Sequence, residues 1–278
     1  MITRFAPSPT GPLHLGHAYS AILAHDMAKA AGGVFLLRIE DIDQSRARPE
    51  WEAQIYDDLH WLGLSWATPV MRQSERLPVY QTALHTLWDQ GLLYPCNCTR
   101  RDIQQAAAAP QEGALQYGPD GVIYPGTCRD KPRPDVMGDM ALRLDMRRAA
   151  ATVAWTEDST PDKKQVFGPE AFVQTIGDVV LARRNMGTSY HLSVVLDDAA
   201  QKISHVIRGA DLADSTPIHV LLQKLLNLPT PIYHHHKLIR DDAGKRLAKR
   251  DDARAISKYR DEGATPNDIR RMVGLPAV

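Results

Sequence analysis

Residues 2–17, ITRFAPSPTGPLHLGH, hold the pattern that decides the fold of this chain. Ile2 to Ala6 is a short apolar segment that predicts a β-strand, and the run of prolines with a glycine behind it predicts a loop. From Gly16 to Ala31 good helix formers predict a helix, which two glycines close, and Val34 to Ile39 (VFLLRI) predicts a buried strand. A strand, loop, helix and strand in this order are typical of a parallel α/β sheet.

The rest of the chain predicts a sheet that is interrupted and then resumed. Between Tyr94 and Val166 the cysteines, prolines, glycines and short apolar segments such as Met140 to Leu144 indicate an inserted subdomain of loops and strands. The other expected elements are helices at 49–61, 77–90 and 215–226, strands at 179–183, 192–196 and 233–239, and a last short helix that starts at Thr265 and ends at Gly274.

The overall charge limits how the chain can bind nucleic acid. Its 278 residues carry 33 basic and 33 acidic side chains, so no global basic field is present and any tRNA contact must be a local patch. On charge alone the most basic short stretch, Lys245 to Arg250, is more typical of a solvated helix face than of a tRNA contact. No apolar run of membrane-spanning length and no leader pattern occur, so we expect a cytoplasmic protein without membrane contact.

His14-Leu15-Gly16-His17 stands where the first helix is expected to begin. Free backbone N–H groups and the positive end of the helix dipole favour an anion such as a polyphosphate at this place. Two imidazoles add hydrogen-bond donors, and the glycine lets phosphates approach the backbone. Four such residues alone could also form a loop with two solvated histidines.

The motifs in order resemble glutamyl-tRNA synthetases. Arg4 to Gly11 (RFAPSPTG) with His14 to His17 looks like the first signature of that family, and Leu37 to Asp43 (LRIEDID) looks like the next. Tyr190 to Leu212 resembles the third, and Arg246 to Arg250 (RLAKR) sits where the family carries its second ATP-binding loop. The likeness thus runs from residue 4 to residue 250.

The resemblance implies an α/β fold, the Rossmann-like parallel sheet of a class I synthetase with an inserted, zinc-containing, acceptor-binding-like subdomain. We expect the first half of the catalytic domain at 1–93, the insertion at 94–177 and the second half at 178–240. The second ATP-binding loop and a short helical tail would occupy 241–278. Because the chain ends 28 residues after Arg250, no anticodon-binding domain is expected.

A glutamate pocket needs groups for an ammonium and two carboxylates. By resemblance Arg4 and Arg208 belong to it, and a guanidinium matches the planar fork of a carboxylate, so Arg208 is the candidate for the side-chain carboxylate. Glu40 and Tyr190 would hold the ammonium. The remaining members of the predicted pocket are Phe5, Ala6, Pro7 and Ser8.

The ATP site implied by the resemblance joins the first helix to the second loop. His14 and His17 are the catalytic candidates there, together with Lys249, which would neutralise charge near the α-phosphate as pyrophosphate leaves. Mg²⁺ is expected to accompany ATP, held mainly by phosphates. The full predicted set is His14, Gly16, His17, Arg246, Leu247, Ala248, Lys249 and Arg250. Arg246 and Ala248 replace the lysine and serine of the usual loop, so a hydroxyl contact is missing.

Three cysteines, an odd number, suit reduced thiols or a metal site better than a disulfide framework. Cys96, Cys98 and Cys128 are plausible thiolate ligands of one structural zinc ion per chain. The spacing with Tyr124 resembles the zinc site of the short glutamyl-tRNA synthetase-like enzymes, which makes this tyrosine the candidate for the fourth ligand. Tyr117 or His85 remains an alternative.

The resemblance points most closely to the short synthetases that attach glutamate to the queuosine base of tRNA(Asp). The expected activity is a ligase reaction of the aminoacyl-tRNA synthetase type: ATP-dependent activation of L-glutamate to glutamyl-adenylate without tRNA, then transfer to queuosine. The partners are L-glutamate, ATP and tRNA(Asp) that carries queuosine, and we expect a monomer. Two alternatives stay open: a truncated enzyme that charges the 3′ end of tRNA(Glu), and a non-catalytic tRNA-binding paralogue.

Overall fold

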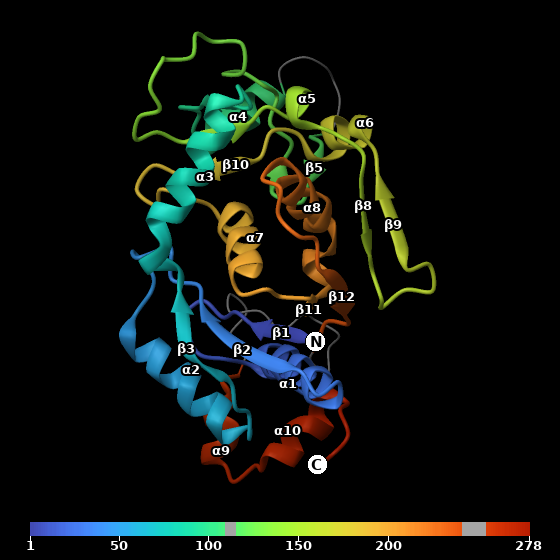
Figure 1. Cartoon of the computed structure of the whole chain (residues 1–278). Coiled ribbons are helices and arrows are strands. Elements are labelled where there is room, and N and C mark those ends of the chain that lie inside the picture. The colour runs from blue at the N-terminus through green and yellow to red at the C-terminus, as the bar shows by residue number, and fades with distance from the viewer. Residues whose placement is uncertain (109–114, 241–253) are drawn as a thin grey trace.

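The computed structural model describes residues 1–108, 115–240 and 254–278 (Figure 1). The N-terminal part contains β1 (Ile2–Phe5), α1 (Leu15–Ala30), β2 (Val34–Ile39), α2 (Pro49–Trp61), β3 (Ala67–Arg72), a 3₁₀ turn at Gln73–Arg76 and α3 (Leu77–Asp89). Strand β1 pairs in parallel with β2, and β2 in parallel with β3. The strand–helix–strand unit predicted for the first forty residues is confirmed.

A second pair of parallel strands, from later in the chain, lies beside the first three. Strands β11 (His205–Gly209) and β12 (Ile232–His236) pair in parallel, and β11 follows α7 (Tyr190–Ala200) while α8 (Thr216–Leu225) connects the two strands. The Ser204 N–H, just before β11, donates to the Ile2 carbonyl at 3.0 Å, so the two strand pairs adjoin at β1. Figure 1 shows β1, β11 and β12 side by side across the middle of the molecule. The predicted α/β class with a parallel sheet is confirmed.

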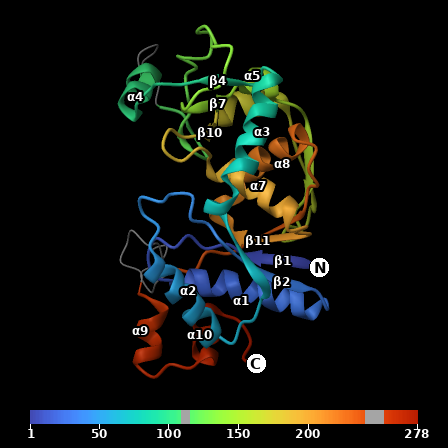
Figure 2. The same ribbon diagram turned by 60° about the vertical axis from the view of Figure 1, so that its left-hand side comes forward.

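The segment predicted as an insertion forms small antiparallel units in the upper part of the molecule (Figure 2). Strand β7 (Leu142–Leu144) lies between β4 (Leu93–Pro95) and β10 (Val180–Ala182), antiparallel to both. Two hairpins, β5–β6 (Tyr117–Gly118, Gly121–Val122) and β8–β9 (Val153–Thr156, Lys164–Phe167), project from this region. Its short helical elements are α4 (Arg100–Ala108), α5 (Met146–Ala149), α6 (Pro169–Ala171) and a π-helical turn at Phe172–Ile176.

One predicted strand is wrong. Residues 192–196 lie inside α7, whose N-cap Ser189 accepts a hydrogen bond from the Leu192 N–H. The run LSVVL predicts a strand because its apolar residues show no helical period. In the structure four of its five residues are buried, so this helix is covered on nearly every side. Tyr190 therefore lies in the first turn of a helix rather than before a strand.

The tail packs below the sheet. It contains α9 (Ile256–Asp261) and α10 (Pro266–Val273), and Thr265 and Asp268 form a reciprocal capping box at the start of α10. Gly274 ends α10 with a φ of 77°, a left-handed conformation that favours glycine. Arg270 in α10 pairs with Asp26 in α1 at 2.7 Å and fastens the tail to the first helix.

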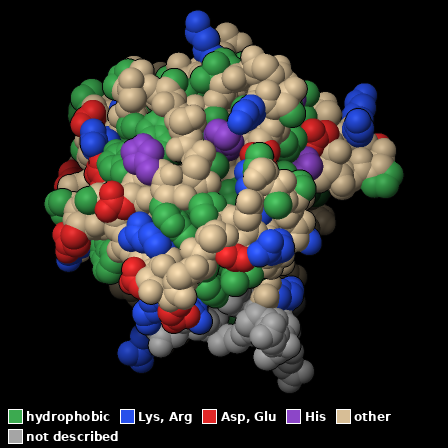
Figure 3. Space-filling model, turned by 90° about the horizontal axis from the view of Figure 1, so that it is seen from below, with side chains coloured by type: hydrophobic (Ala, Val, Ile, Leu, Met, Phe, Trp, Pro, Cys, Tyr) green, Lys and Arg blue, Asp and Glu red, His purple; other side chains and the backbone are tan. Residues whose placement is uncertain are grey.

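The surface shows no dominant charge on the side that α9 and α10 cover. Seen from below, basic and acidic side chains are interspersed across the described residues of that face (Figure 3). This agrees with the balanced composition. Among the helices that the structure describes, none has both the length and the apolar character needed to cross a bilayer.

Candidate active site

A cavity of about 500 Å³ opens at the carboxyl ends of the parallel strands. Its walls come from the ends of β1, β2, β11 and β12 and from the start of α1, the place where open α/β sheets bind ligands. The lining residues are Arg4, Phe5, Ala6, Ser8, His14, Gly16, His17, Ser20, Glu40, Tyr190, Ile207, Arg208, Gly209, Asp211, Leu212, His236, Leu238 and Ile239.

The structure brings nearly all of the predicted glutamate residues to this one cavity. Of the eight, only Pro7 is absent from the wall, and its carbonyl accepts a hydrogen bond from the Glu40 N–H at 3.0 Å, which fixes the loop beside β2. His14, Gly16 and His17 line the cavity as well. Arg246, Leu247, Ala248, Lys249 and Arg250, the predicted second ATP-binding loop, lie outside the described residues.

Two histidines form the entrance to α1. The His14 Nδ1 accepts from the Gly16 N–H at 3.1 Å, and the His17 Nδ1 accepts from the His14 N–H at 3.2 Å. Because Nδ1 is the acceptor in both rings, each neutral ring carries its proton on Nε2. The capping bonds therefore orient both histidines as Nε2–H donors at a positive helix end, a polarity that suits phosphate.

A network of buried charges supports the floor of the cavity. Asp198 of α7 accepts from Arg4 Nε at 2.9 Å and from Arg38 Nη1 at 2.8 Å, and Arg38 also pairs with Glu40 at 3.3 Å. Asp197 binds Arg76 Nε at 2.6 Å. Sequence reasoning missed these supporting residues, although an arginine inside the apolar strand VFLLRI was a signal that Arg38 needs a buried acidic partner.

The network shifts the titration of its acids in opposite directions. Burial alone would raise the pKa of Asp198, but the charges of Arg4 and Arg38 outweigh it and hold the pKa below its ordinary value. Burial raises the pKa of Glu40, and Arg38 and Arg4 offset this only in part. The positive charges of the two arginines thus do not fully offset the burial of the Glu40 carboxylate. A ligand ammonium beside it would stabilise its ionised form further.

The two arginines of the cavity differ in how many donors they retain. Arg4 uses Nε and one Nη2–H on Asp198, so its Nη1–Nη2 edge keeps a pair of donors. Arg208 has four of its five N–H groups bonded within the protein, to His235, His219, Leu212 and Thr216. A fork-like grip on a carboxylate is therefore available from Arg4, whereas Arg208 keeps a single N–H on Nη1.

The histidine run 234–236 divides between the two faces of β12, as alternation along a strand requires. His236 lines the cavity and accepts from the Ser20 hydroxyl at 2.7 Å, while its Nδ1 donates to the Lys237 carbonyl at 2.9 Å. His235 faces the other way and donates from Nδ1 to Glu157 at 2.5 Å. Among the described residues, the group of side chains placed closely enough to hold a metal ion is that of the three cysteines, and the histidine run is not part of it.

Glu157 should make stability depend on pH. Burial would raise its pKa, but hydrogen bonds from His235 and Ser159 lower it from 4.5 to about 2. Because the folded state binds the proton less tightly than the unfolded state, the stabilisation is present above about pH 4.5 and is lost as pH falls towards 2. We expect the difference in free energy of unfolding between wild type and Glu157→Gln, measured in urea, to shrink over that window. A difference that stays constant down to pH 2 would contradict this assignment.

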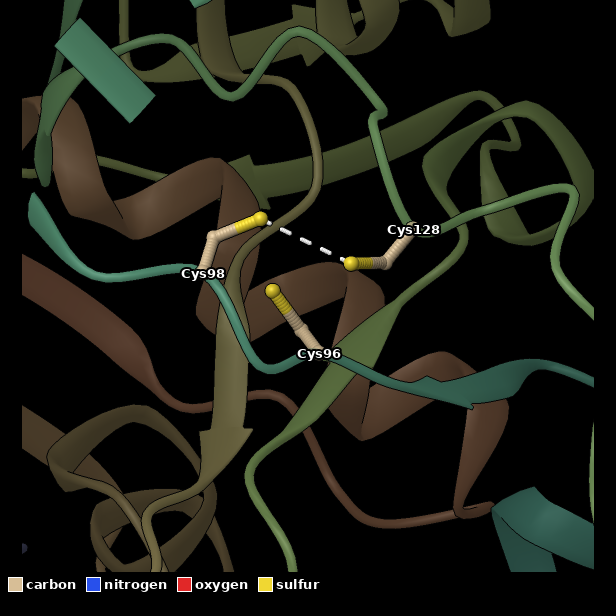
Figure 4. Close-up of side chains that lie close together, drawn as sticks. All are labelled: Cys96, Cys98 and Cys128. Carbon is tan, nitrogen blue, oxygen red and sulfur yellow. Dashed lines mark hydrogen bonds between the residues drawn. The ribbon is translucent and has the colours of Figure 1, made fainter. Parts of the chain in front are cut away.

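The side chains of the three cysteines, Cys96, Cys98 and Cys128, point toward one another (Figure 4). Their sulfurs all lie within 4.8 Å of one another, and Cys98 Sγ is 3.5 Å from Cys128 Sγ, close to the spacing of thiolates on one tetrahedral zinc. The Tyr124 hydroxyl lies 3.4 Å from Cys96 Sγ and 3.3 Å from Cys98 Sγ. Arg143 Nε donates a hydrogen bond to Cys96 Sγ at 3.3 Å.

The fold and the cavity define the class of this protein. A parallel sheet, a histidine-bearing helix entrance and a charged pocket at the carboxyl edge form a class I tRNA synthetase catalytic domain, and the family model for tRNA synthetases class I (E and Q), catalytic domain, matches residues 1–277. Within that class the chain belongs to the glutamyl-Q tRNA(Asp) synthetase family. It is 66% identical to the glutamyl-Q tRNA(Asp) synthetase of Rhodobacter capsulatus, over 99% of this chain and 100% of that protein.

Other relatives agree with this placement. The glutamyl-Q tRNA(Asp) synthetase of Nocardia farcinica is 42% identical over 98% of this chain and 85% of that protein. Among solved structures, a glutamate tRNA ligase from Elizabethkingia meningosepticum in complex with its amino acid is similar, with a TM-score of 0.75 and 27% identity over 98% of this chain. This chain spans 60% of the length of that ligase.

Proposed function

We propose that this chain activates L-glutamate with ATP in the absence of tRNA and then transfers the glutamate to the queuosine base of tRNA(Asp). The observation that carries the proposal is the single cavity in which two arginines, Glu40 and Tyr190 meet the histidine entrance of α1. The charges of glutamate match the part of the cavity that holds the arginines and Glu40. A polyphosphate matches the part at the histidines of α1. The names of the relatives support the same substrate and acceptor.

Donor geometry refines the roles within the pocket. Arg4 is the better candidate for the side-chain carboxylate of glutamate, because its free edge can donate two parallel N–H bonds. Arg208, with one N–H left, suits a single oxygen of the α-carboxylate and leaves the other oxygen to react. Glu40 pairs with the ammonium, and Tyr190, whose pKa burial raises, stays a neutral hydroxyl beside it.

The reaction needs two displacements. An α-carboxylate oxygen attacks the α-phosphorus of ATP, the bond to the bridging oxygen breaks and pyrophosphate leaves. A hydroxyl of queuosine then attacks the carbonyl carbon, the bond to the phosphate oxygen breaks, AMP leaves and the hydroxyl proton passes to solvent. His14 and His17 bind and orient the phosphates, and Lys249 is proposed to act on them from the second loop. Mg²⁺ held by the phosphates supplies further charge neutralisation.

Exchange of pyrophosphate into ATP tests this function directly. We expect the purified protein to catalyse this exchange without tRNA and only when glutamate is present. Adding tRNA(Asp) should not change this dependence on glutamate. Exchange only with tRNA(Glu), and glutamate found at the 3′ end of that tRNA, would favour a glutamyl-tRNA synthetase activity instead. No exchange under any condition would leave a non-catalytic tRNA-binding role.

We also propose that the upper region binds one structural zinc ion through Cys96, Cys98, Tyr124 and Cys128. The Tyr124 hydroxyl already lies among the sulfurs, whereas the alternative Tyr117 is 68% exposed and His85 is exposed on α3. Bound zinc would cross-link the strand end at Pro95 to the loop after β6. The donor set is typical of structural zinc except for the phenolate.

Metal content and competition by a chelator check the fourth ligand. We expect one zinc per wild-type chain, and a zinc affinity that falls at least about 10-fold in Tyr124→Phe because one donor atom is removed. The matched controls Tyr117→Phe and His85→Ala should behave as wild type. Loss of affinity in either control, with Tyr124→Phe unchanged, would reassign the ligand.

A further inference from the structure

The guanidinium of Arg208 is held from behind by two hydrogen-bonded arms that contain histidine. In the first arm, Arg208 Nη1 lies 2.9 Å from His219 Nδ1, His219 Nε2 lies 3.0 Å from His191 Nδ1, and His191 Nε2 lies 2.9 Å from Asp120 Oδ1. Four elements contribute: β11, the helices α8 and α7, and the turn between β5 and β6. The arm therefore crosses from the glutamate pocket to the predicted insertion.

The chemistry of arginine fixes the direction of every bond in this arm. A guanidinium can only donate, so His219 must accept at Nδ1 and carry its proton on Nε2. That proton is donated to His191 Nδ1, which leaves the His191 proton on Nε2, facing the Asp120 carboxylate. Burial and the nearby charge of Arg208 lower the pKa of His219 well below its ordinary value, which agrees with a neutral ring. All donors thus point outward from Arg208 to Asp120.

The second arm repeats this order on another edge of the guanidinium. Arg208 Nε donates to His235 Nε2 at 3.0 Å, and His235 Nδ1 donates to Glu157 at 2.5 Å. Glu157 also accepts from the backbone N–H of His235 at 3.0 Å. Each arm therefore ends on a carboxylate. In both arms, neutral histidines lie between this carboxylate and the charged guanidinium of Arg208, which the arm orients.

Both terminal carboxylates come from residues 94–177, the segment predicted as an insertion. A second cavity of about 770 Å³ lies beside the arms, with Glu157, His235, Gly118 of β5 and the turn residue Pro119 in its wall. Thr216, which accepts from Arg208 Nη2 at 2.7 Å, lines that cavity too. The position of Arg208 is thus set by parts of the chain that lie outside the glutamate pocket.

We propose that Asp120 and Glu157 are positioning residues for substrate binding, which act on Arg208 through His191 and His219 in one arm and through His235 in the other. This inference rests on the proposed function, because it assigns Arg208 to the glutamate carboxylate. The arms hold the guanidinium of Arg208 at the wall of the cavity, where its one remaining N–H is the donor left for a ligand. Loosening an arm lets that N–H drift, and glutamate binding weakens while ATP binding does not.

Asp120 is the residue at which this proposal is best tested. Its side chain is 49% exposed, so Asp120→Ala leaves no buried hole, and the folding of the chain should survive. In Asp120→Ala we expect the KM for glutamate in pyrophosphate exchange to rise about 2- to 30-fold, the range of coupling carried through packed networks. The KM for ATP should stay within the error of the wild-type value.

The conservative variant Asp120→Asn separates positioning from simple stability. Its amide oxygen can still accept from His191 Nε2, so we expect it to recover most of the wild-type KM for glutamate. Asp135→Ala, an exposed acid in the same segment, is the matched control and should change neither KM. An equal rise in both KM values would indicate general damage and overturn the proposal.

Failure of the proposed function and failure of the positioning role give different results. If wild type shows no glutamate-dependent exchange, the proposed function is wrong and this inference falls with it. If wild type is active but Asp120→Ala keeps its glutamate KM within about 1.5-fold, only the positioning role is overturned. Nitrogen-15 NMR of the histidine rings gives a readout independent of activity, with Nε2–H expected in His191 and His219 and Nδ1–H in His235. A protonated His219 would contradict the directed arm.

Discussion

Asp198→Ala is expected to destabilise the folded protein by about 3–5 kcal/mol, the cost of removing one partner from a buried ion pair. Asp198 accepts from both Arg4 and Arg38, and its side chain is 7% exposed. Without it, two buried guanidinium groups lose their shared counter-charge. Among the acidic residues that the structure describes, Glu40 and the more distant Asp197 carboxylate, 3.9 Å from Arg38 Nε, would remain paired with Arg38.

The loss is a large share of the stability of an ordinary domain, about 5–15 kcal/mol. We expect urea unfolding at neutral pH to show it, with Asp198→Asn intermediate because an amide keeps hydrogen bonds but no charge. The matched control is Asp43→Ala, which removes an acid paired with the 70% exposed Arg46 and should cost about 0–1 kcal/mol. Equal costs for Asp198→Ala and Asp43→Ala would show that the buried network does not stabilise the fold.

The sequence predicted the sheet and the cavity well because both depend on local patterns. Strand β2 and helix α2 were predicted with their observed bounds, and the predicted pocket residues lie at strand ends, where parallel strands bring them together. Thr265 and Gly274 were recognised as helix ends because capping chemistry is local. The domain boundaries and the roles of the site residues remain predictions.

Features that depend on distant pairs could not be predicted. Asp198 and Arg4 are separated by 194 positions, and no local pattern connects them. The same holds for His219 and Asp120, which meet only through His191. The strand predicted at 192–196 was wrong because burial of nearly a whole helix removes the periodicity that separates helix from strand.

The donor count makes Arg4 the critical test of glutamate recognition. Arg4→Lys keeps a positive charge near Asp198 but loses the planar pair of donors on the free edge. We expect kcat/KM for glutamate in pyrophosphate exchange to fall about 30- to 5,000-fold, since truncating one partner of a buried charge pair costs about 2–5 kcal/mol. The KM for ATP should change little, because the phosphates bind at the histidine end of the cavity.

Glutamine separates the roles of the two arginines. If Arg4 holds the side-chain carboxylate, Arg4→Lys should lose more activity with glutamate than with glutamine, and the preference for glutamate should narrow. Arg208→Lys should weaken both substrates alike, because both carry the same α-carboxylate. Arg72→Lys, in a half-exposed pair with Glu52, is the control and should leave the kinetics unchanged. The reverse result, a narrowed preference in Arg208→Lys alone, would return the side-chain carboxylate to Arg208 and require its bonds to the two histidine arms to break when glutamate binds.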